Sequence, residues 1–296
     1  MEILYEHPSV KKFVHKVENP SVKNTLIPLN SRVCIDGGSG SGKTHALLSF
    51  VVRSPNTFQH IVCINQGIEE PLYDTLRDKL GKKGTITFFT VDDYPTAKEL
   101  SASREHESDQ YLVVFDDIIA DLNTQKKIDK LKQYMIFGRK LNLTTFVLTQ
   151  NYYSIDKSIR MQMSHIILLR LNNDRDFEQI IRGFQTLGTT KDQLMQMYRI
   201  ATTLPLNFLK IDCLGTDANK KFTRNFTDEF HLSSVIDKYG RESTAVSAGP
   251  WYKEGILKRK RAFESKNKNK RKKPDSEEEE EEEEESSSDS SCEDEN

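Results

Sequence analysis

The sequence lacks the patterns that mark several classes of protein. It has only four cysteines in 296 residues, and none of them lies in a C-x-x-C pair, so we expect neither a zinc site nor a disulfide framework. No apolar run approaches the ~18 residues needed to span a bilayer. The N-terminus also has no basic start followed by an apolar segment, as a signal peptide would have. We therefore expect a soluble, intracellular protein whose cysteines are mostly buried thiols.

Acidic and basic residues are separated along the chain, although the formal net charge is only −2. Residues 258–273 carry ten Lys/Arg and one Glu, and residues 275–296 carry fourteen Asp/Glu and no base. This leaves residues 1–257 with a formal net charge of +3. Because the low-complexity end has too few apolar residues to form a core, we predict a disordered tail over 251–296.

Two basic clusters in the tail resemble a bipartite nuclear-import signal. They consist of Lys258, Arg259, Lys260 and Arg261, and of Lys270, Arg271, Lys272 and Lys273. A nucleic-acid-binding tail is a compatible alternative. The acidic run that follows is expected either to solubilise the chain or to bind a basic partner, such as a capsid or core protein.

A glycine-rich segment fits the pattern G-x-x-x-x-G-K-[ST] at every fixed position: Gly37, Gly38, Ser39, Gly40, Ser41, Gly42, Lys43 and Thr44. A strand-like run precedes it and a helix-like stretch follows it, as a phosphate-binding P-loop requires. In such a loop, backbone N–H groups surround phosphate oxygens, the lysine reaches the β- and γ-phosphates, and the Thr hydroxyl binds Mg²⁺. We expect ATP and Mg²⁺ as ligands; the alternative is a Gly/Ser-rich turn that only resembles a P-loop.

Short apolar runs alternate with helix-like stretches up to about residue 170. Their nearly continuous apolar character predicts buried strands of a parallel sheet that is covered on both faces. These strands are expected at 32–36, 60–65, 85–91, 111–116, 144–149 and 165–170. Helices are expected at 43–53, 70–80, 96–104, 124–140 and 155–162, and within 172–200. The pattern predicts a doubly wound α/β domain.

The predicted domain covers residues 31–250 and follows an N-terminal lead-in over 1–30. Its core spans about 31–185, and 186–250 forms a helical and strand extension with a strand pair at 206–212 and 221–226.

Two further segments carry polar residues at the ends of predicted strands. Asp116 and Asp117 follow an apolar run, as in a Walker B element, where the first acid would hold Mg²⁺ and the second would orient or deprotonate water. The alternative is that both acids cap the next helix. Gln150 ends the 144–149 strand and would sense the γ-phosphate or position water; the alternative is a plain polar strand end.

The order of these segments resembles the FtsK/HerA superfamily of DNA-pumping ATPases. The resemblance rests on Gly138-Arg139 before a strand that ends in Thr149-Gln150, followed by a turn, a helix and Arg160. Within that superfamily the chain looks most like the poxvirus-type genome-packaging ATPases of eukaryotic DNA viruses. Many such ATPases have Asp-Glu where this chain has Asp116-Asp117.

The resemblance implies a RecA-like (ASCE) core in which the Gln150 strand lies between the P-loop strand and the Asp116 strand. It also implies a homo-oligomeric ring that packages double-stranded DNA and hydrolyses ATP between subunits. Arg139 is then the first choice for a finger that reaches the neighbour's γ-phosphate, and Arg160 the second; either could instead be a surface base. The expected location is the host nucleus or the assembling virion.

Sequence-independent DNA contacts are expected from the helix over 124–140, which carries Lys126, Lys127 and Lys130. A solvated helix face is the alternative.

Three other functions are compatible with a P-loop. A small-molecule kinase would need an arginine-rich lid, and after residue 150 the arginines are single. A regulatory GTPase would need an N-K-x-D clamp, which the chain does not contain. A nuclear scaffold that binds nucleotide only for structure would keep its role when Lys43 is replaced.

Overall fold

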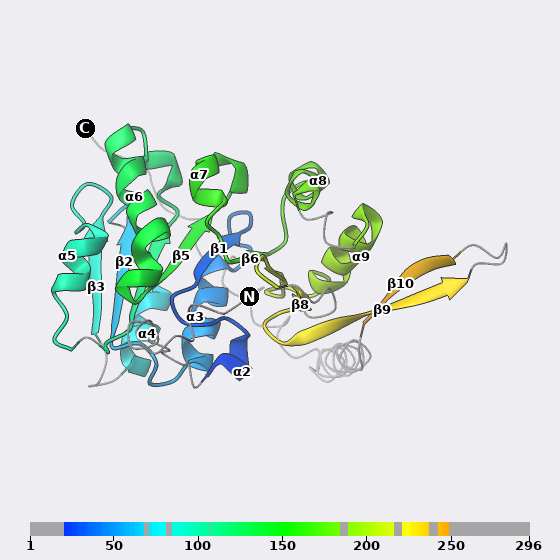
Figure 1. The fold of residues 1–296 in the computed structure, drawn as a ribbon, viewed down its shortest axis with the longest axis horizontal. Coiled ribbons are helices and arrows are strands. Elements are labelled where there is room, and N and C mark those ends of the chain that lie inside the picture. Colours follow the sequence, from blue (N-terminus) through cyan, green and yellow to red (C-terminus); the bar gives the residue numbers. More distant parts are fainter. Residues whose placement is uncertain are drawn as a thin grey trace, which may run out of the picture. The chain divides into compact units, whose positions relative to one another are not determined.

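A single mixed sheet forms the centre of the fold (Figure 1). The computed structural model describes residues 21–67, 71–80, 85–106, 108–183, 189–215, 221–236 and 242–248, the last 13 strand residues by their backbone only. In this part ten strands are ordered β10-β9-β8-β7-β6-β1-β5-β4-β2-β3.

The strands on one side of the sheet are parallel, and those on the other side are antiparallel. Pairs among β1 to β6 are parallel, whereas the pairs from β6–β7 to β9–β10 are antiparallel. The bounds are β1 (Arg32–Asp36), β2 (His60–Asn65), β3 (Thr85–Thr90), β4 (Tyr111–Asp116), β5 (Leu143–Thr149), β6 (His165–Leu168), β7 (Leu209–Asp212), β8 (Phe222–Arg224), β9 (Asp228–Ile236) and β10 (Glu242–Ala248). The predicted α/β class is confirmed, as is the position of β5 between β1 and β4.

The helices follow the strands in alternation through the parallel part. They are α2 (Val22–Thr25), α3 (Lys43–Arg53), α4 (Pro71–Leu80), α5 (Ala97–Ala102), α6 (Gln125–Phe137), α7 (Lys157–Arg160), α8 (Asp174–Arg182) and α9 (Lys191–Ala201). Short 3₁₀ turns occur at η3 (Ile119–Asp121), η4 (Gly138–Leu141) and η5 (Tyr152–Ser154). Among the described residues, no helix is both long enough and apolar enough to cross a membrane.

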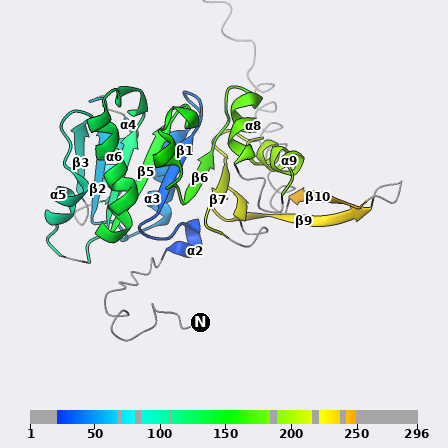
Figure 2. The ribbon, with the colours of Figure 1, turned by 45° about the horizontal axis from the view of Figure 1, so that its top comes forward.

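Both faces of the parallel strands are covered by helices (Figure 2). On one face, Phe50 of α3 packs against Phe146 of β5 with ring centroids 4.7 Å apart, and both side chains are buried. On the other face, the buried ring of Tyr134 from α6 meets Phe115 of β4 edge-on at 5.2 Å. Covering both faces explains why these strands are apolar at successive positions.

Several elements differ from the sequence-based expectation. The helix predicted over 124–140 ends at Phe137 and tightens into η4, which stops at Asn142 in a left-handed conformation (φ 50°). The helical stretch over 172–200 is two helices, because the side chains of Asn173 and Thr190 each cap a separate N-terminus. The β9–β10 hairpin was not predicted.

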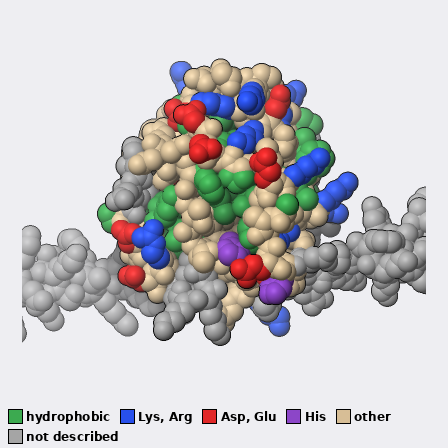
Figure 3. Space-filling view, turned by 90° about the vertical axis from the view of Figure 1, so that its left-hand side faces the viewer, with side chains coloured by type: hydrophobic (Ala, Val, Ile, Leu, Met, Phe, Trp, Pro, Cys, Tyr) green, Lys and Arg blue, Asp and Glu red, His purple; other side chains and the backbone are tan. Residues whose placement is uncertain are grey.

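The predicted burial of two cysteines is confirmed. Cys34 lies in β1 and Cys63 in β2, and both are buried and unpaired. At the outer end of the sheet the edge strand β3 exposes Phe88, which is 38% accessible and lies under the guanidinium of Arg77 at 5.8 Å. Figure 3 shows apolar side chains on this side of the molecule, with charged groups around them.

Candidate active site

The predicted P-loop connects β1 to the N-terminus of α3. Gly40 (φ 68°) and Gly42 (φ 102°) adopt left-handed conformations that L side chains rarely take. A Cβ on Gly40 would find nothing within 4 Å, so this part of the loop borders open space. The 11-residue helix α3 directs its N-terminus, with its partial positive charge, at the loop. These features suit the binding of an anion.

The polar side chains of the loop fit a phosphate ligand. Lys43 Nζ donates to the carbonyl oxygens of Gly37 (3.1 Å) and Gly38 (3.4 Å), so the ammonium lies over its own loop. Ser41 Oγ is buried and has no hydrogen-bond partner in the described part of the chain. A lysine held at the loop and an unsatisfied hydroxyl are donors that phosphate oxygens could use.

The end of β5 holds both halves of the site. The carbonyl oxygen of Thr149 accepts from Gly37 N (3.2 Å), and that of Leu148 accepts from Asp117 N (3.1 Å). Gln150 follows directly, and its Nε2 donates to Asp117 Oδ2. The structure therefore brings the P-loop, Asp117 and Gln150 together at the carboxyl edge of the sheet.

Asp116, the last residue of β4, and Asp117, which follows it, do not cap a helix. Thr124 caps α6 with its own side chain, and η3 has no side-chain cap. Asp117 instead adopts a left-handed conformation (φ 54°), which turns the chain at the strand end. The helix-cap alternative is thereby excluded for both Asp116 and Asp117.

Asp116 has a partner that the sequence did not reveal. Tyr73 of α4 is buried, and its hydroxyl donates to Asp116 Oδ2 at 2.7 Å. Burial raises the pKa of Asp116; the Tyr73 hydrogen bond opposes the rise, the Asp117 charge adds to it, and the Lys43 charge opposes it. Asp116 and the Thr44 hydroxyl provide hard oxygen ligands of the kind that Mg²⁺ prefers.

Asp36, directly before the P-loop, is a second residue that the sequence did not single out. It is 1% exposed, and burial raises its pKa to about 7, although backbone N–H groups of Tyr152 and Gly37 and the charge of Lys43 oppose the rise. Its carboxyl group thus lies close to the first residue of the loop and to η5, and its Oδ1 has no hydrogen-bond partner in the described structure. Only the fold reveals this placement, because η5 lies more than a hundred residues further along the chain.

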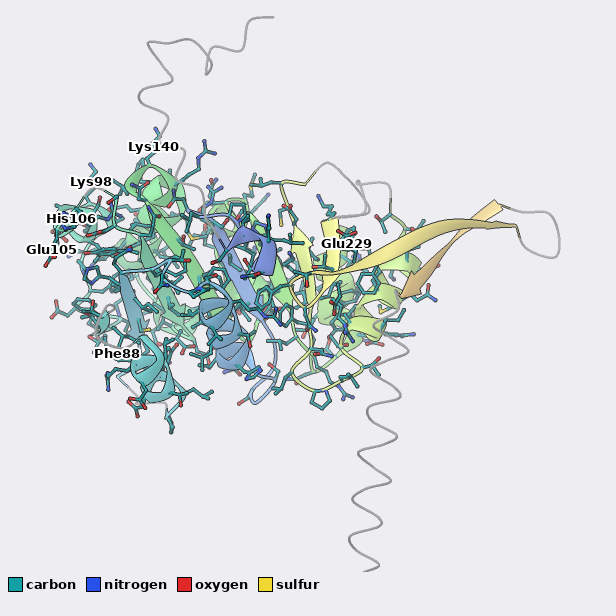
Figure 4. The ribbon with its side chains drawn as sticks, turned by 90° about the horizontal axis from the view of Figure 1, so that it is seen from below. Phe88, Lys98, Glu105, His106, Lys140 and Glu229 are labelled. Atoms are coloured by element: carbon teal, nitrogen blue, oxygen red, sulfur yellow. The ribbon has the colours of Figure 1, made fainter. Side chains whose placement is uncertain are left out.

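The two candidate finger arginines differ in their surroundings. Arg139 lies on η4 before β5 begins, whereas Gln150 follows the end of that seven-residue strand. At about 3.3 Å per residue, Arg139 is roughly 20 Å from the P-loop edge of its own subunit. Figure 4 shows its neighbour Lys140 directed outward from the ribbon. Arg160, in contrast, is packed over Tyr152 (5.5 Å) and Tyr153 (4.5 Å).

The three lysines predicted to contact DNA are not equivalent. Lys127 Nζ pairs with Asp92 at 2.7 Å, and Lys130 donates to the carbonyl oxygen of Tyr94 while lying 4.1 Å from its ring. Lys126 is exposed. Two of the three lysines thus hold α6 to the loop between β3 and α5. The basic clusters over 258–273 lie outside the described residues.

A family match extends over most of this architecture. The family model "Poxvirus A32 protein" matches residues 20–211, which include the P-loop, both acids and Gln150. The chain belongs to the poxvirus A32 protein family. This confirms the poxvirus-type resemblance drawn from the segment 138–160.

Individual relatives are more distant. The chain is 26% identical over 205 residues to the DNA packaging protein OPG160 of Variola virus, covering 66% of this chain and 73% of that protein. Over 200 residues it is also 26% identical to OPG160 of Vaccinia virus (strain Copenhagen), with 64% and 71% covered. Among solved structures, the DNA-packaging ATPase B204 of Sulfolobus Turreted Icosahedral Virus is similar, with a TM-score of 0.47 and 14% identity, covering 67% of this chain and 97% of B204.

The Tyr73 hydroxyl is predicted to orient Asp116 for Mg²⁺. Tyr73→Phe keeps the ring but removes the donor, so we expect Mg²⁺ binding in the presence of ATP to weaken about tenfold. Mn²⁺ titration followed by EPR measures this affinity independently of turnover.

Tyr94→Phe is the matched control, since the buried hydroxyl of Tyr94 has no hydrogen-bond partner in the described structure. If both variants bind the metal as wild type does, Tyr73 has no part in positioning Asp116.

Proposed function

We propose that the protein is an ATPase that drives double-stranded DNA into an assembling virus particle. One observation carries the proposal: the P-loop, Asp117 and Gln150 are held at one sheet edge by consecutive carbonyl groups of β5. Membership of the poxvirus A32 family supports it, because relatives in Variola and Vaccinia viruses are named DNA packaging proteins.

The residues divide the chemistry of hydrolysis between them. The loop amides and Lys43 bind the phosphates, while Thr44 and Asp116 hold Mg²⁺. When bound, Mg²⁺ neutralises charge that develops on the phosphate oxygens. Asp117 orients the attacking water and accepts its proton, and Gln150 holds the Asp117 carboxylate. Gln150 directly follows β5 and donates to Asp117. A movement of β5 would therefore shift the carboxylate that acts as the base.

DNA binding is proposed to be independent of sequence. Lys126 on α6 is the exposed member of the three predicted lysines, and phosphate contacts of this kind release counterions. Lys127 and Lys130 already hold α6 to the body of the subunit, so their contribution is to orient the helix. A basic capsid or core protein is the proposed partner of the acidic tail.

A ring of identical subunits would complete each site. Arg139 is too far from its own P-loop to act there, and its side chain is exposed, so it is suited to reach a neighbouring subunit. Arg160 remains the second candidate, although the two tyrosine rings hold its guanidinium. The assembling virion is the proposed place of action; no observation supports the host nucleus.

The proposal predicts ATP hydrolysis that duplex DNA accelerates. We expect a rate that rises with DNA and falls as salt increases, since the DNA contacts are electrostatic. Lys43→Ala should lose ATP binding and turnover, whereas Lys98→Ala, at an exposed lysine on α5, should behave as wild type. Phosphate release on particles sized by light scattering measures both the rate and the assembly.

Two outcomes would indicate a function other than DNA packaging driven by ATP. A phosphorylated small molecule as product indicates a kinase, and nucleotide binding without any turnover indicates a scaffold. A monomer that hydrolyses ATP at one rate with and without DNA also contradicts the proposal.

The trans-acting arginine is tested by mixing subunits. Arg139→Ala should reduce hydrolysis by about a thousandfold while ATP still binds. Added to wild type, it should lower activity more than in proportion, because subunits of a coordinated ring act in turn and one inactive site then stalls the others. Arg160→Ala is compared in the same titration, and Lys140→Ala is the control. Mixed with Lys43→Ala, which keeps the arginine but lacks a working P-loop, Arg139→Ala should regain part of the activity; no recovery would show that this arginine does not act between subunits.

A further inference from the structure

A polar cavity of about 530 Å³ lies beyond β6, between residues 170–174 and 198–203. The first segment connects β6 to α8, and the second runs from the last turn of α9 into the loop that follows it. In Figures 1 and 2, α8 and α9 lie on the β6 side of the P-loop strand, away from β5 and β4. The volume falls within the roughly 300–1,000 Å³ of typical small-molecule sites.

The walls of this cavity continue into the P-loop. Asn172 contacts Gly38 so closely that a Cβ on that glycine would overlap its Oδ1. Three residues beyond the cavity, Leu206 adopts a left-handed conformation (φ 65°), and its Cδ2 would lie 2.6 Å from a Cβ on Gly42. The wall of the cavity therefore touches the P-loop at both of these glycines.

The floor of the cavity is rigid. The Tyr198 ring stacks on Phe177 with centroids 4.0 Å apart, which joins α9 to α8. The Tyr198 hydroxyl accepts from Leu171 N (2.7 Å) and donates to the carbonyl oxygen of Leu169 (3.1 Å). These bonds hold the loop after β6 beside the P-loop. A preformed wall of this kind is typical of a binding site.

The strand order sets the direction of a nucleotide along this edge. Asp117 and Gln150 follow β4 and β5, on one side of β1, and they mark the γ-phosphate end. The cavity adjoins β6, on the other side of β1. Phosphates that lie in the loop with their γ end toward Asp117 must therefore extend their nucleoside toward the cavity.

The cavity also has suitable chemistry for a nucleoside. Asp174 and Asn172 offer a carboxylate and an amide, which can bond to ribose hydroxyls. Arg170 and Arg199 line the same space, and a guanidinium can stack on the face of a base. Arg199 meets Asp174 at only 3.4 Å with both side chains more than 65% exposed, so a ligand could displace that contact.

We propose that this cavity holds the ribose and base of the nucleotide whose phosphates occupy the P-loop. The assignment rests on the proposed function for the P-loop itself. It identifies residues 170–174 and 198–203, which no motif marks, as the part of the protein that distinguishes a nucleotide from inorganic polyphosphate.

Filling the cavity tests the assignment. Thr203→Phe places a ring at an exposed position of the cavity wall, in space that the nucleoside would take, so we expect ATP binding to weaken by about tenfold. Inorganic tripolyphosphate with Mg²⁺ has no nucleoside, so its affinity should not change. Isothermal titration calorimetry with both ligands measures the difference. Thr75→Phe, at an exposed threonine in the separate groove between α3 and α4, is the matched control.

The possible results distinguish failure of the nucleoside site from failure of the proposed ATPase. Unchanged ATP affinity in Thr203→Phe overturns the nucleoside site. A wild-type protein that binds neither ATP nor tripolyphosphate overturns the site and the ATPase together. ATP binding that depends on the cavity, without turnover that responds to DNA, contradicts the motor and supports the nucleoside site.

A second measurement covers the case in which Thr203→Phe does not fold. Irradiation of wild-type protein with 8-azido-ATP should label peptides that contain residues 170–174 or 198–203. Labelling confined to any other peptides overturns the assignment.

Discussion

Two consecutive carbonyl groups at the end of β5 connect the halves of the proposed active site. Leu148 O accepts from Asp117 N, and Thr149 O accepts from Gly37 N. Because β5 lies between β1 and β4, it pairs with the strand that leads to the P-loop and with the strand that leads to the acids. The distance between phosphate and base thus depends on a strand whose seven residues are all buried.

The helices on both faces make this edge rigid. Phe50 of the P-loop helix α3 packs on Phe146 on one face of the sheet, and Tyr134 packs on Phe115 on the opposite face. Tyr73 extends from α4 to Asp116, and the buried Asp36 carboxyl group lies close to both the loop and η5. The polar groups of the site are consequently held by partners from several elements, as preorganised catalysis requires.

The parallel core could be predicted from the sequence because each buried strand is a short apolar run. The P-loop and the ends of β4 and β5 were also recognisable, since their residue types occur at fixed positions next to strands. Tyr73 could not be found in this way, because its contact with Asp116 joins segments 43 residues apart. The same holds for the cavity beside β6, whose two walls are separate segments that meet only in the folded chain.

Two other features had weaker signals in the sequence. One is the break between α8 and α9, and the other is the contact of Lys127 with Asp92 and of Lys130 with Tyr94. Thr190 and Gln193 form a capping box that the sequence contains, but the continuous helical spacing of Phe177 to Phe184 favoured one long element. The lysines were expected to face DNA, because nothing in their spacing indicates Asp92 or the Tyr94 carbonyl group. Tertiary contacts decide both features.

Hydrolysis of ATP that is already bound tests the role of the β5 edge most directly. In a single-turnover experiment with excess enzyme and DNA, Asp117→Asn should bind ATP as wild type does and form almost no ADP, because the amide cannot accept the proton of water. ADP formation at the wild-type rate would contradict the mechanism, since Asp117 would then have no part in cleaving the bound triphosphate.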